Sequence, residues 1–481
     1  MLCVLLWFRS ATQPRNSPQM VKRSSMKQAA LDAPAAVGGR RNALLCGHVD
    51  DPRKSLPVAV FVFAWRRVAS LKRLVASLQG AEYCGANLSL TILFDARPAG
   101  FAVAFARTLS WPHGPYRYVI ATRPYSIRGM WTEVLSQELE REAESTHVLP
   151  LEDDIEVSPL FYVWLLRASR AYGPFDHALG SRHSPHLAGI SLFAPRLNEI
   201  RYPMASWSPR QDGVVGDAPV FLFQMPCSWG ALFFREHWRR FRSFYNERAR
   251  PPFYNASHEA MQRGARGTRE VLGDPVLAIR GSRASTWPRS WKRFMIDYFY
   301  GRGDVMLYPS SPADPRRPQQ AMSLSTTYME RGDHSGTDSR VEGTQADALK
   351  LPKDYDLRKT VPLLRMHDAA VAHWAMQQLP PFTELPVIDL FHKRVPSLHD
   401  LEVSGHAFVE GRAAAAARRS QRRRVAQQPD ALAVESASDG EDDRPATCDR
   451  DLQSPVPSAA EYSKLSRLWL CDLSTPRKEC S

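Results

Sequence analysis

Three consecutive acidic side chains are the first candidates for chemistry. Glu152, Asp153 and Asp154 directly follow the apolar run VLPL in the segment THVLPLEDDIEVSP. Adjacent carboxylates that leave a buried strand repel one another and lose hydration, so they stay ionised together only if a cation or fixed donors compensate them. Mg²⁺ or Mn²⁺ suits such oxygen ligands and is commonly held together with phosphate oxygens of a substrate. The triplet therefore predicts a divalent-cation site that also binds a diphosphate.

Such a site suggests group transfer. When a bond to a nucleoside diphosphate breaks, negative charge develops on the leaving group, and a bound divalent ion stabilises it. The simpler interpretation is that the acids decorate a solvated turn and favour the N-terminus of a helix that begins near Pro159. The apolar run before the triplet and the aromatic segment FYVWLL after it favour a crevice.

The segments around the triplet predict an α/β fold. VAVFVFAW, from residue 58, is typical of a strand buried on both faces, and VASLKRLVASL after it has helical spacing. Further strands are predicted at LSLTILFD, YRYVIAT, THVLPLE, LAGISLF, PVFLFQM, WGALFF and DVMLYP, and a polar helix at 130–144. Alternating strands and helices predict a mostly parallel sheet with its binding crevice at the carboxyl ends of the strands, where the triplet stands.

Composition divides the chain into five regions. Residues 1–55 read as a flexible N-terminal segment, and 56–309 as the patterned α/β domain. Residues 310–350, rich in Pro, Ser, Thr, Gly and Asp, predict a long loop or insertion. Residues 351–409 regain apolar spacing and predict an extension packed on the core, with a helix at LLRMHDAAVAHWAMQQL. Residues 410–481 predict a disordered tail.

Charge and cysteine content narrow the function classes. The net charge is +13, but six arginines fall within 412–424, so the excess is not spread over a folded face and nucleic acid is not a predicted partner. The seven cysteines include no CxxC pair, which predicts neither a zinc site nor a disulfide framework.

Signals for a cellular compartment are weak. The opening MLCVLLWFRS is too short to span a bilayer, and it leaves open a membrane association through the N-terminus. The sequons Asn87-Leu88-Ser89 and Asn255-Ala256-Ser257 matter only if the chain enters a secretory lumen.

Several segments together resemble a known family. The triplet with IEVSPLFY, and the segments VFAWRRVASLKRLVASL, LTILFDA, PCSWGALFFREHWRRF and TWPRSWKRFMIDYF, are similar to GT-A type nucleotide-sugar glycosyltransferases, most of all to the Golgi N-acetylglucosaminyltransferase I group. The resemblance covers roughly residues 57–309. It implies a three-layer, Rossmann-like GT-A nucleotide-diphospho-sugar transferase fold with a mixed, mostly parallel sheet.

The resemblance also implies roles for the donor-binding residues. Asp154 corresponds to the direct ligand of Mn²⁺ (or Mg²⁺), whereas Glu152 and Asp153 face the ribose and the sugar. Arg67 corresponds to a nucleotide contact, with Arg66 beside it, and Asp95 to a contact of the uracil base. Each residue also has an ordinary interpretation, because arginines at helix starts are commonly solvated and an aspartate after a strand commonly forms a turn.

The remaining roles concern the sugar and the acceptor. Trp229 corresponds to the segment beneath the donor sugar, and Trp291 to the tryptophan-proline segment that precedes the family's catalytic base. Asp297 is the first acid after Trp287-Pro288 and is the candidate base, although Lys292 and Arg293 interrupt the family's pattern. The alternatives are aromatic residues in the core and an Asp297 that forms an ion pair with Arg293.

These observations predict a metal-dependent and inverting glycosyltransferase, of hexosyltransferase or N-acetylglucosaminyltransferase type. The expected donor is a uridine diphosphate sugar, and the acceptor is a hydroxyl of a glycan, lipid or protein. The Golgi or ER lumen is the expected compartment, with the cytoplasm left open.

Two alternatives remain. A nucleotidyltransferase would use the same acids and metal, but AWRRVAS lacks the Gly-rich loop that grips a triphosphate. A non-catalytic nucleotide-sugar-binding relative is disfavoured by the intact triplet.

Overall fold

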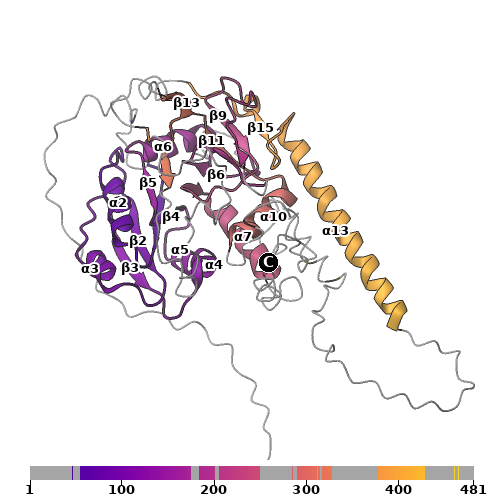
Figure 1. The fold of residues 1–481 in the computed structure, drawn as a ribbon, viewed down its shortest axis with the longest axis horizontal. Coiled ribbons are helices and arrows are strands. Elements are labelled where there is room, and N and C mark those ends of the chain that lie inside the picture. The colour runs from indigo at the N-terminus through magenta and orange to yellow at the C-terminus, as the bar shows by residue number, and fades with distance from the viewer. Residues whose placement is uncertain are drawn as a thin grey trace, which may run out of the picture.

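A mixed, mostly parallel sheet forms the centre of the molecule (Figure 1). The computed structural model describes residues 55–174, 184–200, 205–249, 290–310, 313–314, 317–327, 363–364 and 378–427, with Cys46, Ala284, Ala460 and Lys464. Within these residues the sheet has ten strands in the order β16-β15-β9-β11-β6-β10-β4-β1-β2-β3. Helices cover both faces, which confirms the predicted α/β class.

The first half of the sheet is parallel and alternates with helices. Its strands are β1 (Val58–Ala64), β2 (Ser89–Phe94), β3 (Tyr116–Ile120) and β4 (His147–Glu152). The connecting helices are α2 (Val68–Gln79), α3 (Gly100–Thr108), α4 (Ser126–Gly129), the π-helical turn η2 (Met130–Val134) and α5 (Leu135–Leu139). The four strands lie where the apolar runs predicted them, whereas the helix expected at 130–144 begins at Ser126 and ends at Leu139.

The second half of the sheet mixes orientations. Its strands are β6 (Leu187–Ser191), β9 (Val220–Phe223), β10 (Ala231–Phe233), β11 (Val305–Pro309), β15 (Val387–Ile388) and β16 (Arg394–Val395). Its helices are α6 (Phe161–Tyr172), α7 (Arg235–Arg248) and α10 (Lys292–Arg302). Strand β10 runs antiparallel to both β4 and β6 and so joins the two halves.

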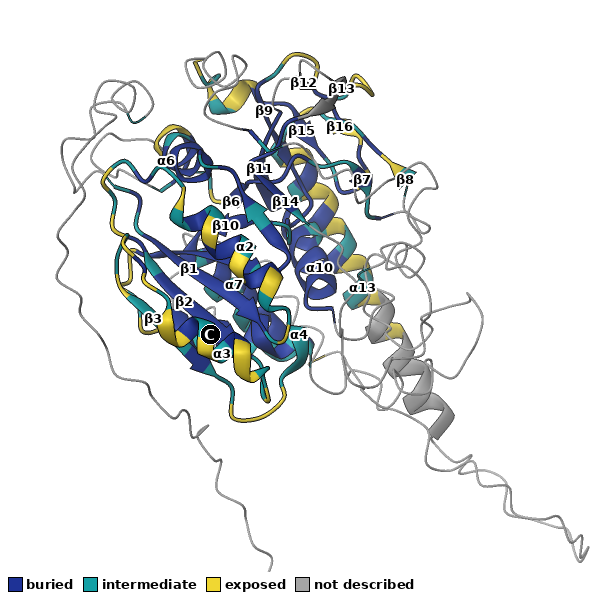
Figure 2. Ribbon diagram, turned by 60° about the vertical axis from the view of Figure 1, so that its left-hand side comes forward, coloured by how far each residue is buried: buried dark blue, intermediate teal, exposed yellow. Residues whose placement is uncertain are grey.

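Alternation along the strands builds two cores, one on each face of the sheet. In β1, Val58, Val60 and Val62 pack with α2, α3 and α6, whereas Ala59, Phe61 and Phe63 pack with η2, α5, α7 and α10. Because successive side chains of a strand point to opposite faces, a continuous apolar run requires cover on both sides. The result is three layers, with the buried sheet between helices (Figure 2).

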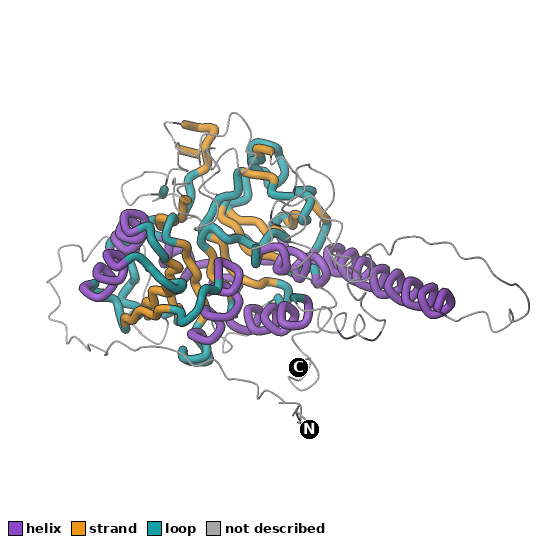
Figure 3. The backbone as a smooth tube through the Cα atoms, turned by 60° about the horizontal axis from the view of Figure 1, so that its bottom comes forward, coloured by secondary structure: helices purple, strands orange, loops and turns teal. Residues whose placement is uncertain are grey.

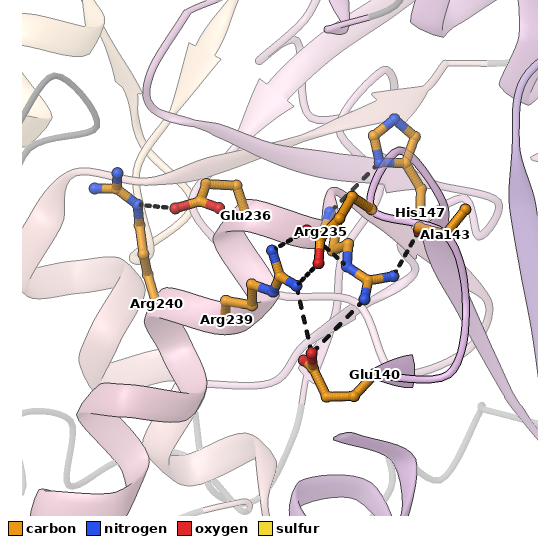
Figure 4. Close-up of polar contacts among 8 residues, drawn as sticks. Glu140, Ala143, His147, Arg235, Glu236, Arg239 and Arg240 are labelled. Atoms are coloured by element: carbon orange, nitrogen blue, oxygen red, sulfur yellow. Dashed lines mark hydrogen bonds and ion pairs between the residues drawn. The ribbon is translucent and has the colours of Figure 1, made fainter. Parts of the chain in front are cut away.

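Helix α7 is tied to the segment that leads into β4. Arg235 is buried and donates to the backbone oxygen of Ala143 at 2.9 Å, while Arg239 lies 3.4 Å from Glu140 (Figure 4). The backbone N–H of Arg235 also donates to Nδ1 of His147 at 3.4 Å. These contacts hold helix α7 against the start of β4, the strand that leads into the acidic triplet.

Short strands appear in a region that we expected to be a loop. Residues 313–327 include β12 (Ala313–Asp314), β13 (Arg317–Ala321) and β14 (Ser325–Thr327). Strand β14 pairs antiparallel with β5 (Ile155–Val157), directly after the triplet. A further pair joins β7 (Leu197–Asn198) to β8 (Ala205–Ser206). The prediction for 310–350 was a long loop or insertion, and these strands show that this part is not a loop throughout.

The end of the described chain is also more ordered than expected. Helix α13 (Leu398–Gln427) extends past the start of the predicted tail at residue 410 and projects from the body of the molecule (Figures 1 and 3). The 3₁₀ turn η4 (Phe382–Glu384) and β15 precede it. The N-terminal segment before Ser55, apart from Cys46, and most of the helix expected at LLRMHDAAVAHWAMQQL lie outside the described residues, as does nearly all of 428–481. None of the helices described here is both long and apolar enough for a bilayer.

A disulfide joins Cys46 to Cys84, in the turn between α2 and β2. The Cα atoms of the pair are 5.5 Å apart, and the two residues are separated by 38 positions. The cysteine spacing indicated no disulfide framework and so did not predict this bond, because pairing depends on which segments the fold brings together and not on a local spacing. Cys46, Glu82 and Cys84 lie close enough together to resemble a metal-binding cluster. The two cysteine sulfurs are bonded to each other, so neither is a thiolate ligand.

Candidate active site at the carboxyl ends of the strands

The fold brings the predicted donor-binding residues to one edge of the sheet. In the parallel register Phe63 of β1 lies beside Glu152 of β4, and Ala64 lies beside Phe94 of β2. The residues that follow these strands, Arg67, Asp95 and the triplet, therefore leave the sheet at the same end. A backbone hydrogen bond of 3.0 Å from Asp153 to Phe63 fixes the triplet to the first strand.

Arg67 closes the acidic triplet. It precedes α2, and its guanidinium donates to Oδ2 of Asp154 at 3.0 Å and, through the other terminal nitrogen, to Oδ1 of Asp153. All three side chains are largely buried, with exposed fractions of 19% for Arg67, 5% for Asp153 and 13% for Asp154. Burial alone would lower the pKa of Arg67, but the charges of Asp154 and Asp153 raise it. Arg67 is therefore a permanent cation of this site and not a solvated helix residue.

Glu152 is the acid that Arg67 does not neutralise. Its Oε1 accepts a hydrogen bond of 3.2 Å from the indole Nε1 of Trp131. Burial, followed by the negative charge of Asp154, raises the pKa of Glu152 to about 8, although Arg67 and the Trp131 hydrogen bond act in the other direction. Three carboxylates thus face one guanidinium, and burial is the main reason that Glu152 is protonated more readily than an ordinary glutamate.

The triplet has the ligand chemistry that a divalent cation prefers, although its three carboxylates are not gathered within 4.8 Å of one another in the described structure. The triplet supplies hard carboxylate oxygens, which Mg²⁺ and Mn²⁺ prefer, and it has more negative charge than Arg67 compensates. Such an ion, bound at Asp154, would supply electrostatic stabilisation of a leaving diphosphate.

Two stacked indoles support the triplet from behind. Trp131 is fully buried, and its ring stacks on that of Trp291 with centroids 3.9 Å apart and planes 14° apart. Trp291 is 3% exposed and precedes the first turn of α10. Trp291 therefore packs behind the triplet as part of a buried wall. Trp131 was missed, because nothing in its polar segment distinguishes a core tryptophan from a hydrogen-bond donor.

Asp95 is occupied by the backbone. Its carboxylate accepts N–H groups of Ala96 at 2.8 Å, Tyr125 at 2.9 Å and Ser126 at 3.0 Å. These bonds hold the start of α4 against the end of β2, so the ordinary interpretation as a turn-former describes what is seen. Arg66 is exposed, with its guanidinium 4.2 Å from the centroid of the Trp65 ring.

Trp229 lies next to an ion pair between Lys292 and Glu199, which the sequence did not indicate. Its ring meets that of Phe193 edge-on, and the ammonium of Lys292 lies 5.4 Å from its centroid. Lys292 is nearly buried and pairs with Glu199 at 2.6 Å. Ser325 of β14 donates to the backbone oxygen of Trp229 at 2.6 Å.

These contacts connect the ion pair with the triplet by two routes. Lys292 directly follows Trp291, which stacks on the indole that donates to Glu152. Strand β14, which holds Trp229, pairs with β5 immediately after Asp154. Glu199 could not be found from the sequence, because it stands in no periodic pattern, and Lys292 was read only as an interruption of the family's motif.

Asp297 does not fit its predicted role. It is 0% exposed in the middle of α10, and its carboxylate lies 3.3 Å from Arg248, which is also 0% exposed. A general base must come within hydrogen-bond reach of the acceptor hydroxyl. A carboxylate held by a buried guanidinium inside a helical layer does not offer that access. The alternative of an ion pair is the better description, with Arg248 of α7 as a partner that the sequence did not indicate.

Comparison with known proteins adds little. No family model matches the chain, and no curated protein matches it. Matches among solved structures include residues 1–349 of TarS from S. aureus, a staphylococcal glycosyltransferase, at 8% identity and a TM-score of 0.26. That match covers 42% of this chain and 52% of the other, about half of its length. A likeness at this level does not identify a family.

Proposed function

We propose that this protein transfers a sugar from a nucleotide-sugar donor to a hydroxyl acceptor, with Mn²⁺ or Mg²⁺ bound at Asp154. One observation carries the proposal: three carboxylates leave β4 at the ligand-binding edge of an α/β sheet, with more negative charge than Arg67 compensates. Ligands of such sheets bind outside the carboxyl ends of the strands. A divalent ion together with a diphosphate is the partner that this charge pattern suits.

Different residues would bind the metal ion, the sugar and the diphosphate. Asp154 would bind the ion, and Glu152 and Asp153 would orient the ribose and the sugar. Arg67, whose guanidinium already lies between two carboxylates, would donate to the diphosphate oxygens beside them, as arginine does in bidentate phosphate recognition. Arg66 and Asp95 would border the nucleotide, Asp95 by fixing the loop before α4. The GT-A resemblance of these segments makes a uridine diphosphate sugar the donor that we propose.

We assign acceptor activation to Glu199. Its side chain is 18% exposed, and its partner Lys292 lies 5.4 Å from the centroid of the partly buried Trp229 ring. As base it would take the proton of the acceptor hydroxyl while that oxygen attacks the anomeric carbon and the nucleoside diphosphate leaves. A single displacement of this kind inverts the anomeric carbon.

The acceptor and the compartment follow from the same proposal. The acceptor would be a hydroxyl of a glycan, lipid or protein, and no nucleic acid is required. The Golgi or ER lumen is the proposed location, with membrane association through the N-terminal segment.

Product analysis tests the proposal. The purified chain would be incubated with uridine diphosphate sugars, Mn²⁺ or chelator, and hydroxyl acceptors. Metal-dependent release of uridine diphosphate with a new glycoside supports it, release of pyrophosphate would indicate a nucleotidyltransferase, and binding without turnover would indicate a non-catalytic relative. Asp154→Asn should abolish the metal-dependent binding of the donor. Asp217→Asn, at a fully exposed carboxylate, is the matched control and should change nothing.

A further inference from the structure

The amino end of β2 presents an exposed sequon. Asn87 is solvent-exposed, Leu88 after it is fully buried, and Ser89 opens the strand with its Oγ 3.2 Å from Oε2 of Glu142. The buried Leu88 and the strand fix the position of the sequon, and Asn87 itself is exposed, with its Oδ1 close to Gly114. Asn-x-Ser with any residue except proline at x is an acceptor for N-linked glycans in the secretory pathway.

The same turn carries the disulfide. Cys84, three positions before Asn87, is bonded to Cys46. Disulfides form and persist in oxidising compartments and are rare in the reducing cytosol. The bond is thus an independent indication that this face of the protein matures where oligosaccharide transfer to asparagine also takes place.

We propose that Asn87 is an N-linked glycosylation site. In the transfer, the Nδ2 nitrogen of Asn87 forms a bond to the anomeric carbon of an oligosaccharide that a polyprenyl diphosphate carries. The bond from that carbon to the phosphate oxygen breaks, the polyprenyl diphosphate leaves with the electron pair, and the amide nitrogen loses one proton to a base of the host transferase. No oxidant or reductant is involved.

The position of Asn87 allows a glycan without loss of the candidate active site. Asn87 precedes β2, whereas Asp95 and the acidic triplet follow the carboxyl ends of β2 and β4. A six-residue strand spans about 20 Å, so the glycan would leave from the opposite edge of the sheet. The inference does not depend on the proposed sugar transfer, because it rests on the sequon, the exposure of Asn87 and the disulfide.

Glycosidase treatment of the full chain tests the inference. The chain would be expressed in eukaryotic cells from its own N-terminus, with Asn255→Gln to remove the other sequon. We expect peptide N-glycosidase to increase electrophoretic mobility and to convert Asn87 to aspartate in the tryptic peptide 74–107, since trypsin does not cleave between Arg97 and Pro98. Asn87→Gln and Ser89→Ala should lose the shift, and Ser89→Thr, which keeps the sequon, should retain it.

Two results would overturn the proposal that Asn87 is glycosylated. An Asn255→Gln chain whose mobility and peptide 74–107 are unaffected by the glycosidase would overturn the proposal, as would a shift that survives Asn87→Gln. A substitution at Asn87 or Ser89 can prevent folding. The conversion of Asn87 to aspartate is therefore measured in the Asn255→Gln chain, which keeps the native residues at positions 87 and 89. Gels with and without reductant report the Cys46–Cys84 bond in the same samples.

Discussion

Arg67 donates to Asp154 across 3.0 Å, and the same guanidinium also binds Asp153. The link joins the turn after the first strand to the turn after the fourth, so the protein itself supplies one positive charge to the acidic edge. A metal at this edge would share the carboxylates with Arg67, and the two cations would then be coupled in any measurement of binding or stability.

Replacing Arg67 should make the fold depend on metal. Arg67→Ala leaves two buried carboxylates without their partner, which costs about 3–5 kcal/mol in comparable cases. We expect a lower melting temperature without metal, and a larger increase on addition of Mn²⁺ than in the native chain, because ligands of the folded state raise its stability. Arg66→Ala, at the exposed neighbour, is the control. Equal Mn²⁺ shifts in all three proteins would contradict the predicted coupling between Arg67 and the metal, and no Mn²⁺ shift in any of them would exclude a metal site at these acids.

Stability without metal should fall as pH rises because of Glu152. Its pKa is 4.5 in ordinary surroundings and about 8 in the folded protein. Between these values the folded state holds a proton that the unfolded state has released, so this contribution is fully present below 4.5 and is lost as pH rises through about 8. Glu152→Gln should flatten this part of the pH profile of the melting temperature.

Mn²⁺ should act in the opposite direction, since it binds the ionised carboxylates. Its stabilising effect on the native chain should grow across the same pH range. A pH profile of Glu152→Gln that is identical to that of the native chain would show that Glu152 does not titrate in this way.

Replacing Glu199 by its neutral amide should reduce turnover, whereas replacing Asp297 by its amide should reduce stability. Glu199→Gln should leave donor binding intact and reduce turnover by about 10²-fold or more, the usual effect of losing a general base. Asp297→Asn should instead lower the melting temperature, because it leaves Arg248 charged and buried. Steady-state kinetics and thermal unfolding of both variants separate the two roles. Normal turnover in Glu199→Gln, with little activity in stable Asp297→Asn, would restore Asp297 as the base.

The disulfide should contribute to stability. Cys84→Ser removes the bond to Cys46 and should cost about 2–4 kcal/mol, chiefly through the unfolded chain, which then regains conformational freedom. Thermal unfolding checks this, and treatment of the native chain with reductant should reproduce the loss. The variant itself should be insensitive to reductant. A native chain with the same melting temperature in both conditions would show that the bond does not form in solution.

Local patterns were enough to predict the central strands and their shared edge. The apolar runs at β1, β2 and β4 require cover on both faces, and parallel strands bring their carboxyl ends together. A role for Arg67 at this end of the sheet was implied only by the family resemblance. Patterns of this kind did not predict the pairing of β5 with β14, which are separated by more than half of the patterned domain. Short strands of three residues have too few positions to show a period.

The chemistry of the candidate site could thus be read from the sequence, whereas the contact partners of its residues could not. The sequence alone determined that acids end a buried strand and that an apolar α/β sheet surrounds them, because these properties depend on neighbours along the chain. Only the tertiary structure decided that Trp131 supports Glu152, that Lys292 holds Glu199, that Asp297 is closed off by Arg248 and that Cys46 meets Cys84. Such contacts join residues from distant segments, and their geometry exists only after the layers have packed.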